Sequence, residues 1–377
     1  MYAGRSAAAN KSRIAFQDVS NRVEQDDASK LEKGKVQKRT AHTVHSVAAV
    51  AKVKKSAPLP KTVTQRSSGA VVKKISYRAI PNPSNSQPKL SSSGKTAVVA
   101  VAKARDIDER DSDDPLMCTS YVQDMYQHFR KQESRAVADP YMGDDDDAIQ
   151  PKLTERMRAI LVDWLVDIHH KMKCDPTTLH LAVQILDRFL ATAVKKASKK
   201  NFQLIGTGAF YIASKYEQIY PVPLCDLVYV CDRLYTEDDI LSMETTILKA
   251  LNYQISLPTS STFLVRFLNA ALADRRLLFL TQYILETSLH QYSLVIKYTP
   301  SQLAAAAVLI GRVAIGRPRW SATLVKYAEY GEDDIIPIAR EVMDENKKLR
   351  FGLTAVKRKY SRDKYYKVAS TALPSEL

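Results

Sequence analysis

The sequence predicts an all-α protein built from two tandem helical bundles, and two observations carry this prediction. In residues 157–168, apolar side chains cover nearly every face of a helix, as expected for a helix at the centre of a bundle. The apolar and acidic pattern of residues 181–204 also recurs, without a gap, 99 residues further on. Such a repeat indicates two copies of one helical unit. We find no alternating pattern long enough to predict a strand.

Residues 1–110 are predicted to form a disordered basic tail. In residues 1–105, 21 Lys and Arg stand against 5 Asp and Glu, and Ser, Ala, Gln and Pro are frequent. Such a segment buries too little apolar surface to offset the entropy lost on ordering. Residues 106–377 hold 35 Lys and Arg against 36 Asp and Glu, so a basic nucleic-acid-binding domain is not expected there.

Three helical regions follow the tail. An apolar stripe predicts an N-terminal helix over residues 116–134. The acidic run 144–147 is interpreted as a solvated loop, because calcium loops alternate their ligands and place a Gly at a fixed position. Prolines that can begin helices then separate the segments of a first bundle, residues 151–255, and a second bundle, residues 256–370.

Several classes of function are not expected. The chain lacks metalloprotease, nucleophile-elbow and phosphate-loop motifs, so we expect neither an enzyme nor a cofactor. The most apolar run, residues 303–315, is too short to span a bilayer, and no secretory signal is found, so no membrane partner is expected. No metal site is predicted, because no C-x-x-C pair or zinc spacing occurs among Cys118, Cys174, Cys225 and Cys231.

Three strings closely resemble the cyclin box of mitotic cyclins, with the B-type branch fitting best. They are M-R-A-I-L-V-D-W-L at 157–165, A-S-K-Y-E-Q-I-Y-P at 213–221 and S-M-E-T-T-I-L-K-A-L-N-Y at 242–253. The resemblance implies two tandem five-helix cyclin boxes preceded by an N-terminal helix. It also implies a regulatory subunit that activates a cyclin-dependent serine/threonine kinase at the G2/M transition, present in nucleus and cytoplasm.

Two alternatives remain open at this point. An A-type (S/G2) cyclin would carry closely similar strings. A transcription factor with paired cyclin folds would bind DNA, but such proteins usually carry a zinc ribbon and basic repeats. This sequence has neither, since its two repeats are close to neutral.

The resemblance assigns kinase binding first to Lys215 and Glu244. Their family counterparts hydrogen-bond backbone groups of the kinase near its αC helix, and charge-assisted bonds of this kind contribute about 1.5–3 kcal/mol each. Without the resemblance, a solvated lysine and glutamate would be the better interpretation. The other residues expected on this face, two of them from the N-terminal helix, are Tyr216, Glu217, Ile219, Leu248, Tyr253, Tyr121 and Tyr126.

Two further sets of residues lie in or near the central helix. Arg158 needs a partner because an unpaired buried charge is very costly, and the resemblance implies an internal ion pair with Asp187. The resemblance also implies an exposed groove that docks Arg-x-Leu motifs of substrates or inhibitors. Core packing is the alternative for its apolar members. The expected groove residues are Met157, Ile160, Leu161, Trp164, Asp167 and Gln203.

The tail contains one motif, R-I-A-F-Q-D-V-S-N at residues 13–21. It resembles the destruction box R-x-x-L-x-x-x-x-N read by the anaphase-promoting ubiquitin ligase, with Arg13 and Asn21 in place and Phe16 where Leu is usual. We therefore expect ubiquitin-mediated destruction at mitotic exit. Basic clusters in the same tail are candidates for nuclear import, although a solvated tail explains them equally well.

Overall fold

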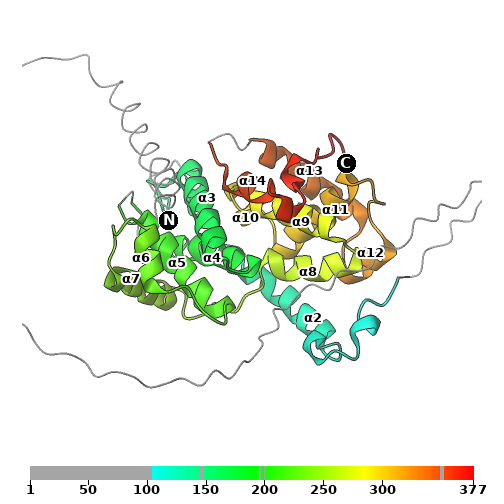
Figure 1. The fold of residues 1–377 in the computed structure, drawn as a ribbon, viewed down its shortest axis with the longest axis horizontal. Coiled ribbons are helices and arrows are strands. Elements are labelled where there is room, and N and C mark those ends of the chain that lie inside the picture. Colours follow the sequence, from blue (N-terminus) through cyan, green and yellow to red (C-terminus); the bar gives the residue numbers. More distant parts are fainter. Residues whose placement is uncertain (1–103, 144–147, 193, 195–196, 199, 349–351) are drawn as a thin grey trace, which may run out of the picture. The chain divides into compact units, whose positions relative to one another are not determined.

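The computed structural model describes residues 104–143, 148–192, 194, 197–198, 200–348 and 352–377. Within these residues every regular element is a helix, which confirms the all-α prediction (Figure 1). Among them, no helix combines the length and apolar character needed to cross a membrane. The same residues bring together no group of three His, Cys, Asp or Glu suited to a metal ion. The destruction-box motif at 13–21 and most of the predicted tail lie outside the described residues.

The first bundle begins with the central helix. Thr154 caps it, because its side-chain oxygen accepts the Met157 N–H at 3.3 Å. The next helix begins at Pro176, in agreement with the predicted break, since proline suits the first turn of a helix. The five helices of this bundle are α3 (Glu155–Met172), α4 (Pro176–Leu190), α5 (Phe202–Glu217), α6 (Leu224–Val230) and α7 (Glu237–Ala250).

The second bundle repeats this plan and adds a short helix. The residues matched at a spacing of 99 fall on α4, on α9 and its C-cap Leu289, and on the first turns of α5 and α11, so the internal repeat is a repeat of structure. The short α10 (Tyr292–Lys297) is inserted between the repeated helices, and α14 (Ala355–Tyr360) follows the bundle. The repeated helices are α8 (Ser260–Ala270), α9 (Arg275–Ser288), α11 (Pro300–Ala314), α12 (Ala322–Ala328) and α13 (Glu332–Lys348).

Two glycines let α5 approach its neighbours closely, as the sequence predicted. A Cβ atom built on Gly206 would lie 2.9 Å from Leu161 Cδ1 of α3, and one on Gly208 would lie 2.8 Å from Met243 Cγ of α7. Both distances are shorter than packed side chains tolerate. The helix propensity lost at each glycine, about 1 kcal/mol relative to Ala, is therefore offset by close packing.

The N-terminal helix is shorter than the predicted 116–134. Helix α2 spans Val122–Gln132 and continues as a 3-10 turn to Arg135. Before it, Pro115–Met117 forms a separate 3-10 turn that ends at Cys118, where the backbone adopts a left-handed φ of 51°. A helix cannot run through such a residue. The apolar stripe alone gave no sign of this interruption.

Residues 104–110, which the sequence assigned to the disordered tail, are ordered and packed on the second bundle. Ile107 is buried, and its N–H donates to the hydroxyl of Tyr327 at 3.3 Å. The guanidinium of Arg266 on α8 is ion-paired with Asp108, with Nη2 2.6 Å from Oδ2. The predicted boundary at 110 is therefore too late, because an anchoring Asp and Ile precede it.

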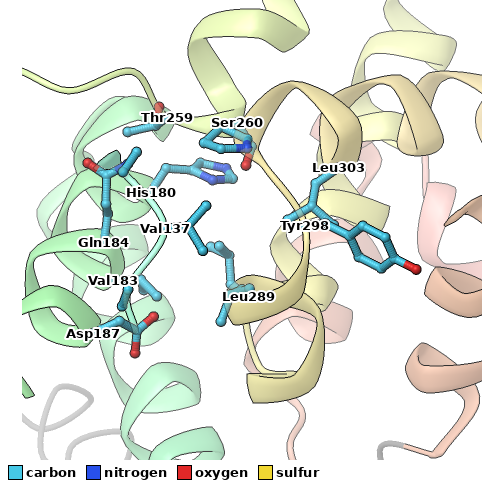
Figure 2. Close-up of a pocket in the computed structure, with 14 residues that line it drawn as sticks. Val137, His180, Val183, Gln184, Asp187, Thr259, Ser260, Leu289, Tyr298 and Leu303 are labelled. Atoms are coloured by element: carbon cyan, nitrogen blue, oxygen red, sulfur yellow. The ribbon is translucent and has the colours of Figure 1, made fainter. Parts of the chain in front are cut away.

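A small cavity of about 50 Å³ lies at the junction of the two bundles (Figure 2). His180 of α4, Ser260 of α8 and Leu303 of α11 contribute to its wall. The Gln184 side chain lies on the same wall, and its Nε2 donates to the Pro258 carbonyl at 2.9 Å. The connection between the bundles is thus fixed by a hydrogen bond from the first bundle.

Buried histidines give the fold a predicted pH dependence. Burial lowers the pKa of His180 to about 4 and that of His169 to about 3, against 6.5 in an open chain. The unfolded chain therefore binds more protons below pH 6.5, so stability falls as the pH is lowered through that value. Each histidine should contribute about 1.4 kcal/mol per pH unit, measured by urea unfolding between about pH 6.5 and pH 5.

Single substitutions separate this effect from general acid sensitivity. His180→Gln should make the decline in the free energy of unfolding shallower by about 1.4 kcal/mol per pH unit, whatever its effect at neutral pH. The matched control is His128→Gln, since His128 is exposed on α2, and the control should leave the slope unchanged. If the free energy of unfolding falls with the same slope against pH in the wild-type, His180→Gln and His128→Gln proteins, His180 does not cause the pH dependence.

Candidate functional site

Lys215 and Glu244, the two charges predicted to bind a kinase, form an ion pair with each other. Lys215 lies in the last turn of α5, and its Nζ also lies 4.4 Å from the centroid of the Tyr211 ring. Glu244 lies on α7, a helix begun by a capping box in which Thr236 and Asp239 bond each other's backbone N–H. The Lys215 side chain is 39% exposed and that of Glu244 only 10%, so the pair stands at the edge of the core.

Large exposed apolar side chains lie on the chain segments that follow α5 and α7, the two helices that carry this pair. Ile219 and Tyr220 follow α5 and are 82% and 81% exposed, and Tyr253, just after α7, is 65% exposed. Tyr216 is also exposed, with its hydroxyl 2.6 Å from the Ser256 hydroxyl. Clustered exposed apolar residues are typical of a protein-binding surface. We call the surface formed by Lys215, Tyr216, Ile219, Tyr220, Glu244, Leu248 and Tyr253 the α5–α7 face.

A tight turn places Tyr253 on this face. Asn252 and Tyr253 both adopt left-handed φ values, 49° and 58°. The Tyr253 N–H nevertheless donates to the Leu248 carbonyl at 2.9 Å, which closes the end of α7. A left-handed tyrosine is strained, and strain of this kind is often kept where a side chain must be held in place.

Two predicted members of the kinase-binding set, Glu217 and Tyr126, form hydrogen bonds within the chain. Glu217 is half-buried and bonds Thr177 near the start of α4; burial raises its pKa and the Thr177 hydroxyl lowers it. The Tyr126 hydroxyl donates to the Thr262 carbonyl at 3.0 Å, so this tyrosine anchors α2 to the second bundle. Both were assigned to the face by the resemblance, which carries no information on contacts within this chain. Tyr121 is exposed as expected, and Leu248 is half-buried.

The predicted docking groove maps to one side of α3. Met157, Ile160 and Trp164 are half-exposed at helical spacing, and so are Asp167, one turn further on, and Gln203 on α5. We call these five residues the α3 face. Their arrangement offers an apolar strip with an acid at one end.

Leu161 does not belong to this surface, which corrects the prediction. Its side chain is fully buried, because Gly206 leaves a recess on α5 into which it fits. Leu161 is therefore a core residue. The helical spacing of three and four residues cannot separate it from Met157 and Trp164, since both sides of α3 are apolar.

Arg158 and Asp187 form the expected ion pair, and the pair is wholly internal. Arg158 Nε and Nη2 each lie 2.7 Å from a carboxylate oxygen of Asp187. The Tyr141 hydroxyl donates to the same carboxylate at 2.8 Å, and Arg158 Nη1 donates to the Leu289 carbonyl at 2.8 Å. Burial alone would lower the pKa of Arg158, but Asp187 and Tyr141 raise it overall. The pair therefore also joins α3 to the end of α9, in the second bundle.

The second bundle contains a matching arrangement that sequence reasoning missed. Glu286, the repeat counterpart of Asp187, is fully buried, with Lys359 Nζ 2.6 and 2.8 Å from its oxygens. The Tyr360 hydroxyl donates to it at 2.8 Å, as Tyr141 does to Asp187. The repeat itself was the available signal, since it placed an acid at the same position in both copies.

Comparisons with known proteins agree with this architecture. The sequence profile of the cyclin N-terminal domain matches residues 124–256, and that of the cyclin C-terminal domain matches residues 258–374. Cyclin-B2-1 of rice, Oryza sativa subsp. japonica, is 40% identical over 269 residues, which cover 71% of this chain and 62% of the rice protein. The G2/mitotic-specific cyclin-1 of Medicago sativa subsp. varia is 40% identical over 263 residues, 69% of this chain and 60% of that relative.

A fish protein is matched over more of its length. The G2/mitotic-specific cyclin-B2 of Anguilla japonica is 36% identical over 274 residues, which cover 72% of this chain and 67% of the eel protein. The match thus spans about three-fifths to two-thirds of the length of these relatives. Among solved structures, a viral cyclin from herpesvirus saimiri has a TM-score of 0.49 and 23% identity, covering 54% of this chain and 90% of its own.

The chain therefore belongs to the cyclin family. Within that family it groups with the B-type, mitotic cyclins, which confirms the prediction made from the three cyclin-box strings.

Proposed function

We propose that the chain binds and activates a cyclin-dependent serine/threonine kinase through the α5–α7 face and so drives the G2/M transition and mitosis. The observation that carries the proposal is the Lys215–Glu244 pair at the edge of an exposed apolar surface. An ammonium group has three N–H donors and a carboxylate can accept several bonds, so each partner keeps capacity for a second molecule. Their mutual pairing holds both groups in place before the kinase arrives, which lowers the entropy lost on binding.

The apolar side chains of the α5–α7 face would supply most of the surface area buried against the kinase. Ile219, Tyr220 and Tyr253 project from the two chain segments that flank the ion pair. Packed against the αC helix of a kinase, they would hold its catalytic Glu where it can pair with the Lys that positions ATP. Aromatic anchors around a central polar pair are typical of the residues that dominate binding energy. Exchanging the two charges tests this proposal, with co-purification of the kinase as the readout.

We also propose that the α3 face docks short Arg-x-Leu motifs of substrates or inhibitors. Replacing Met157 and Trp164 by Ala together should reduce phosphorylation of a substrate carrying this motif by about tenfold, because both side chains are half-exposed anchors. Leu161 is left intact, since its replacement would open a cavity in the core. A peptide with the same phosphorylation site and no docking motif is the control, and an equal loss on both would contradict docking.

Destruction by the anaphase-promoting ubiquitin ligase remains a proposal based on the motif at 13–21. Arg13→Ala combined with Phe16→Ala should prolong the half-life of the protein at mitotic exit severalfold. The half-life is measured by blocking protein synthesis and following the amount of protein that remains over time. The matched control is Gln17→Ala, at a variable position of the same motif. An unchanged half-life in the double variant would place the degradation signal elsewhere. We also propose that the protein is present in both nucleus and cytoplasm, with the basic clusters of the same tail supporting nuclear import.

A further inference from the structure

The acidic end of the α3 face is already occupied by a cation from the chain itself. Arg358 of α14 places Nη2 2.5 and 2.6 Å from the two carboxylate oxygens of Asp167. The two residues are 191 positions apart and meet because α14 packs against α3 as well as α9 (Figure 1). Asp167 is the carboxylate that a docking arginine would require.

The helix that carries Arg358 is held firmly at both ends. At its start, Asp163 of α3 accepts the backbone N–H groups of Thr354 and Ala355 at 3.3 and 3.0 Å. At its end, Lys359 and Tyr360 are buried and bound to Glu286 of α9. Arg358 is therefore presented to Asp167 by a fixed element. Its side chain is 57% exposed, and its Nη1 also donates to the Thr354 hydroxyl at 3.2 Å.

Positive groups of the chain also lie near His170, one turn beyond Asp167. Arg362 Nη1 lies 2.5 Å from His170 Nε2, one turn beyond Asp167 on α3. Burial, followed by Arg362, Lys359 and Lys364, lowers the pKa of His170, while Asp167 raises it. The hydrogen bond to Asp167 raises the pKa of Arg358. A second guanidinium arriving from a ligand thus meets an acid that is already paired with Arg358. Basic groups lie nearby, and so does the Asp163 carboxylate, which also raises the pKa of Arg358.

We propose that Arg358 acts as a built-in competitor for the arginine of docking peptides, so that the α3 face selects ligands mainly by their apolar residue. This inference rests on the proposed docking function of the α3 face and adds its regulation. Any partner or modification that draws Arg358 away from Asp167 would open the face to Arg-x-Leu motifs. Because the pair is partly exposed, its displacement is feasible, and the competition should amount to a few-fold change in affinity.

The test compares two fluorescent peptides, one with an Arg-x-Leu motif and one with Ala in place of Arg, binding to the purified full chain. Arg358→Ala should strengthen binding of the Arg peptide about three- to tenfold and leave the Ala peptide unchanged. Asp167→Asn should change binding of the Arg peptide little in the wild-type chain and should remove the gain in the Arg358→Ala chain. Binding of each peptide to each protein is measured by fluorescence anisotropy at low salt.

Arg362→Ala is the matched control, because it removes one nearby positive charge without freeing Asp167. It should have a smaller effect than Arg358→Ala. If Arg358→Ala leaves the Arg peptide unchanged, or strengthens both peptides equally, the competitor role is wrong. If neither peptide binds any of these proteins, the proposed docking function of the α3 face is wrong as well. That result would not bear on kinase binding at the separate α5–α7 face, which is tested by co-purification.

Discussion

A chain that combines Lys215→Glu with Glu244→Lys should stay folded and lose its kinase. The exchange preserves attraction between the two positions, so the internal ion pair can re-form between α5 and α7. It reverses the charges offered to a partner, which removes two charge-assisted hydrogen bonds worth about 1.5–3 kcal/mol each. Affinity for the kinase should therefore fall at least about 100-fold, as measured by co-purification and by titration with purified kinase.

The exchange separates the two roles that the pair could have. If Lys215 and Glu244 serve only to join α5 to α7, each single substitution should weaken the protein and the exchange should restore kinase binding. The matched control is Glu237→Lys with Lys249→Glu, two exposed residues at the ends of α7, which should bind the kinase normally. Kinase binding by the exchanged chain at wild-type strength would remove the α5–α7 face from the account.

Arg158→Met should lower the free energy of unfolding by about 3–5 kcal/mol, the loss expected when one member of a buried ion pair is removed. The substitution keeps much of the side-chain length but leaves the Asp187 carboxylate with only the Tyr141 hydroxyl among these partners. It also leaves the Leu289 carbonyl without its 2.8 Å donor in the second bundle. Denaturant unfolding of the full chain measures the change.

Two comparisons identify the cause of this loss. Adding Asp187→Leu to Arg158→Met should recover part of the stability, because a buried pair replaced by apolar residues costs less than a single unpaired charge. Lys347→Ala breaks the exposed pair with Asp344 and should cost less than about 0.5 kcal/mol. An Arg158→Met protein that unfolds at the wild-type denaturant concentration would show that the pair carries no stability.

Much of the fold could be predicted from local patterns. The repeat fixed which helices correspond, and prolines such as Pro176 and Pro300 marked where helices begin. Gly206 was correctly interpreted as a close-packing residue. Two boundaries were predicted wrongly, because the features that set them are not visible in the hydrophobic periodicity of the sequence. The left-handed backbone at Cys118 shortened α2, and anchoring by Arg266 ordered the chain before residue 110.

The site was predicted less completely, because its contacts join distant parts of the chain. A buried Arg158 requires an acidic partner, and the family resemblance identified that partner as Asp187, so this pair was predicted correctly. The partner of Asp167 could not be found in the same way, since Arg358 is brought to it only by the packing of α14 on α3. An exposed acid can remain solvated, so nothing in its local sequence demands a partner.

The central claim is that the α5–α7 face switches on a cyclin-dependent kinase, and the most direct measurement is phosphate transfer to a peptide by a purified mitotic kinase of this class. Adding the purified chain should stimulate transfer strongly and saturate near one chain per kinase, whereas the charge-exchanged chain should leave the kinase at its basal rate. A wild-type chain that is folded by circular dichroism yet stimulates no cell-cycle kinase would contradict the account.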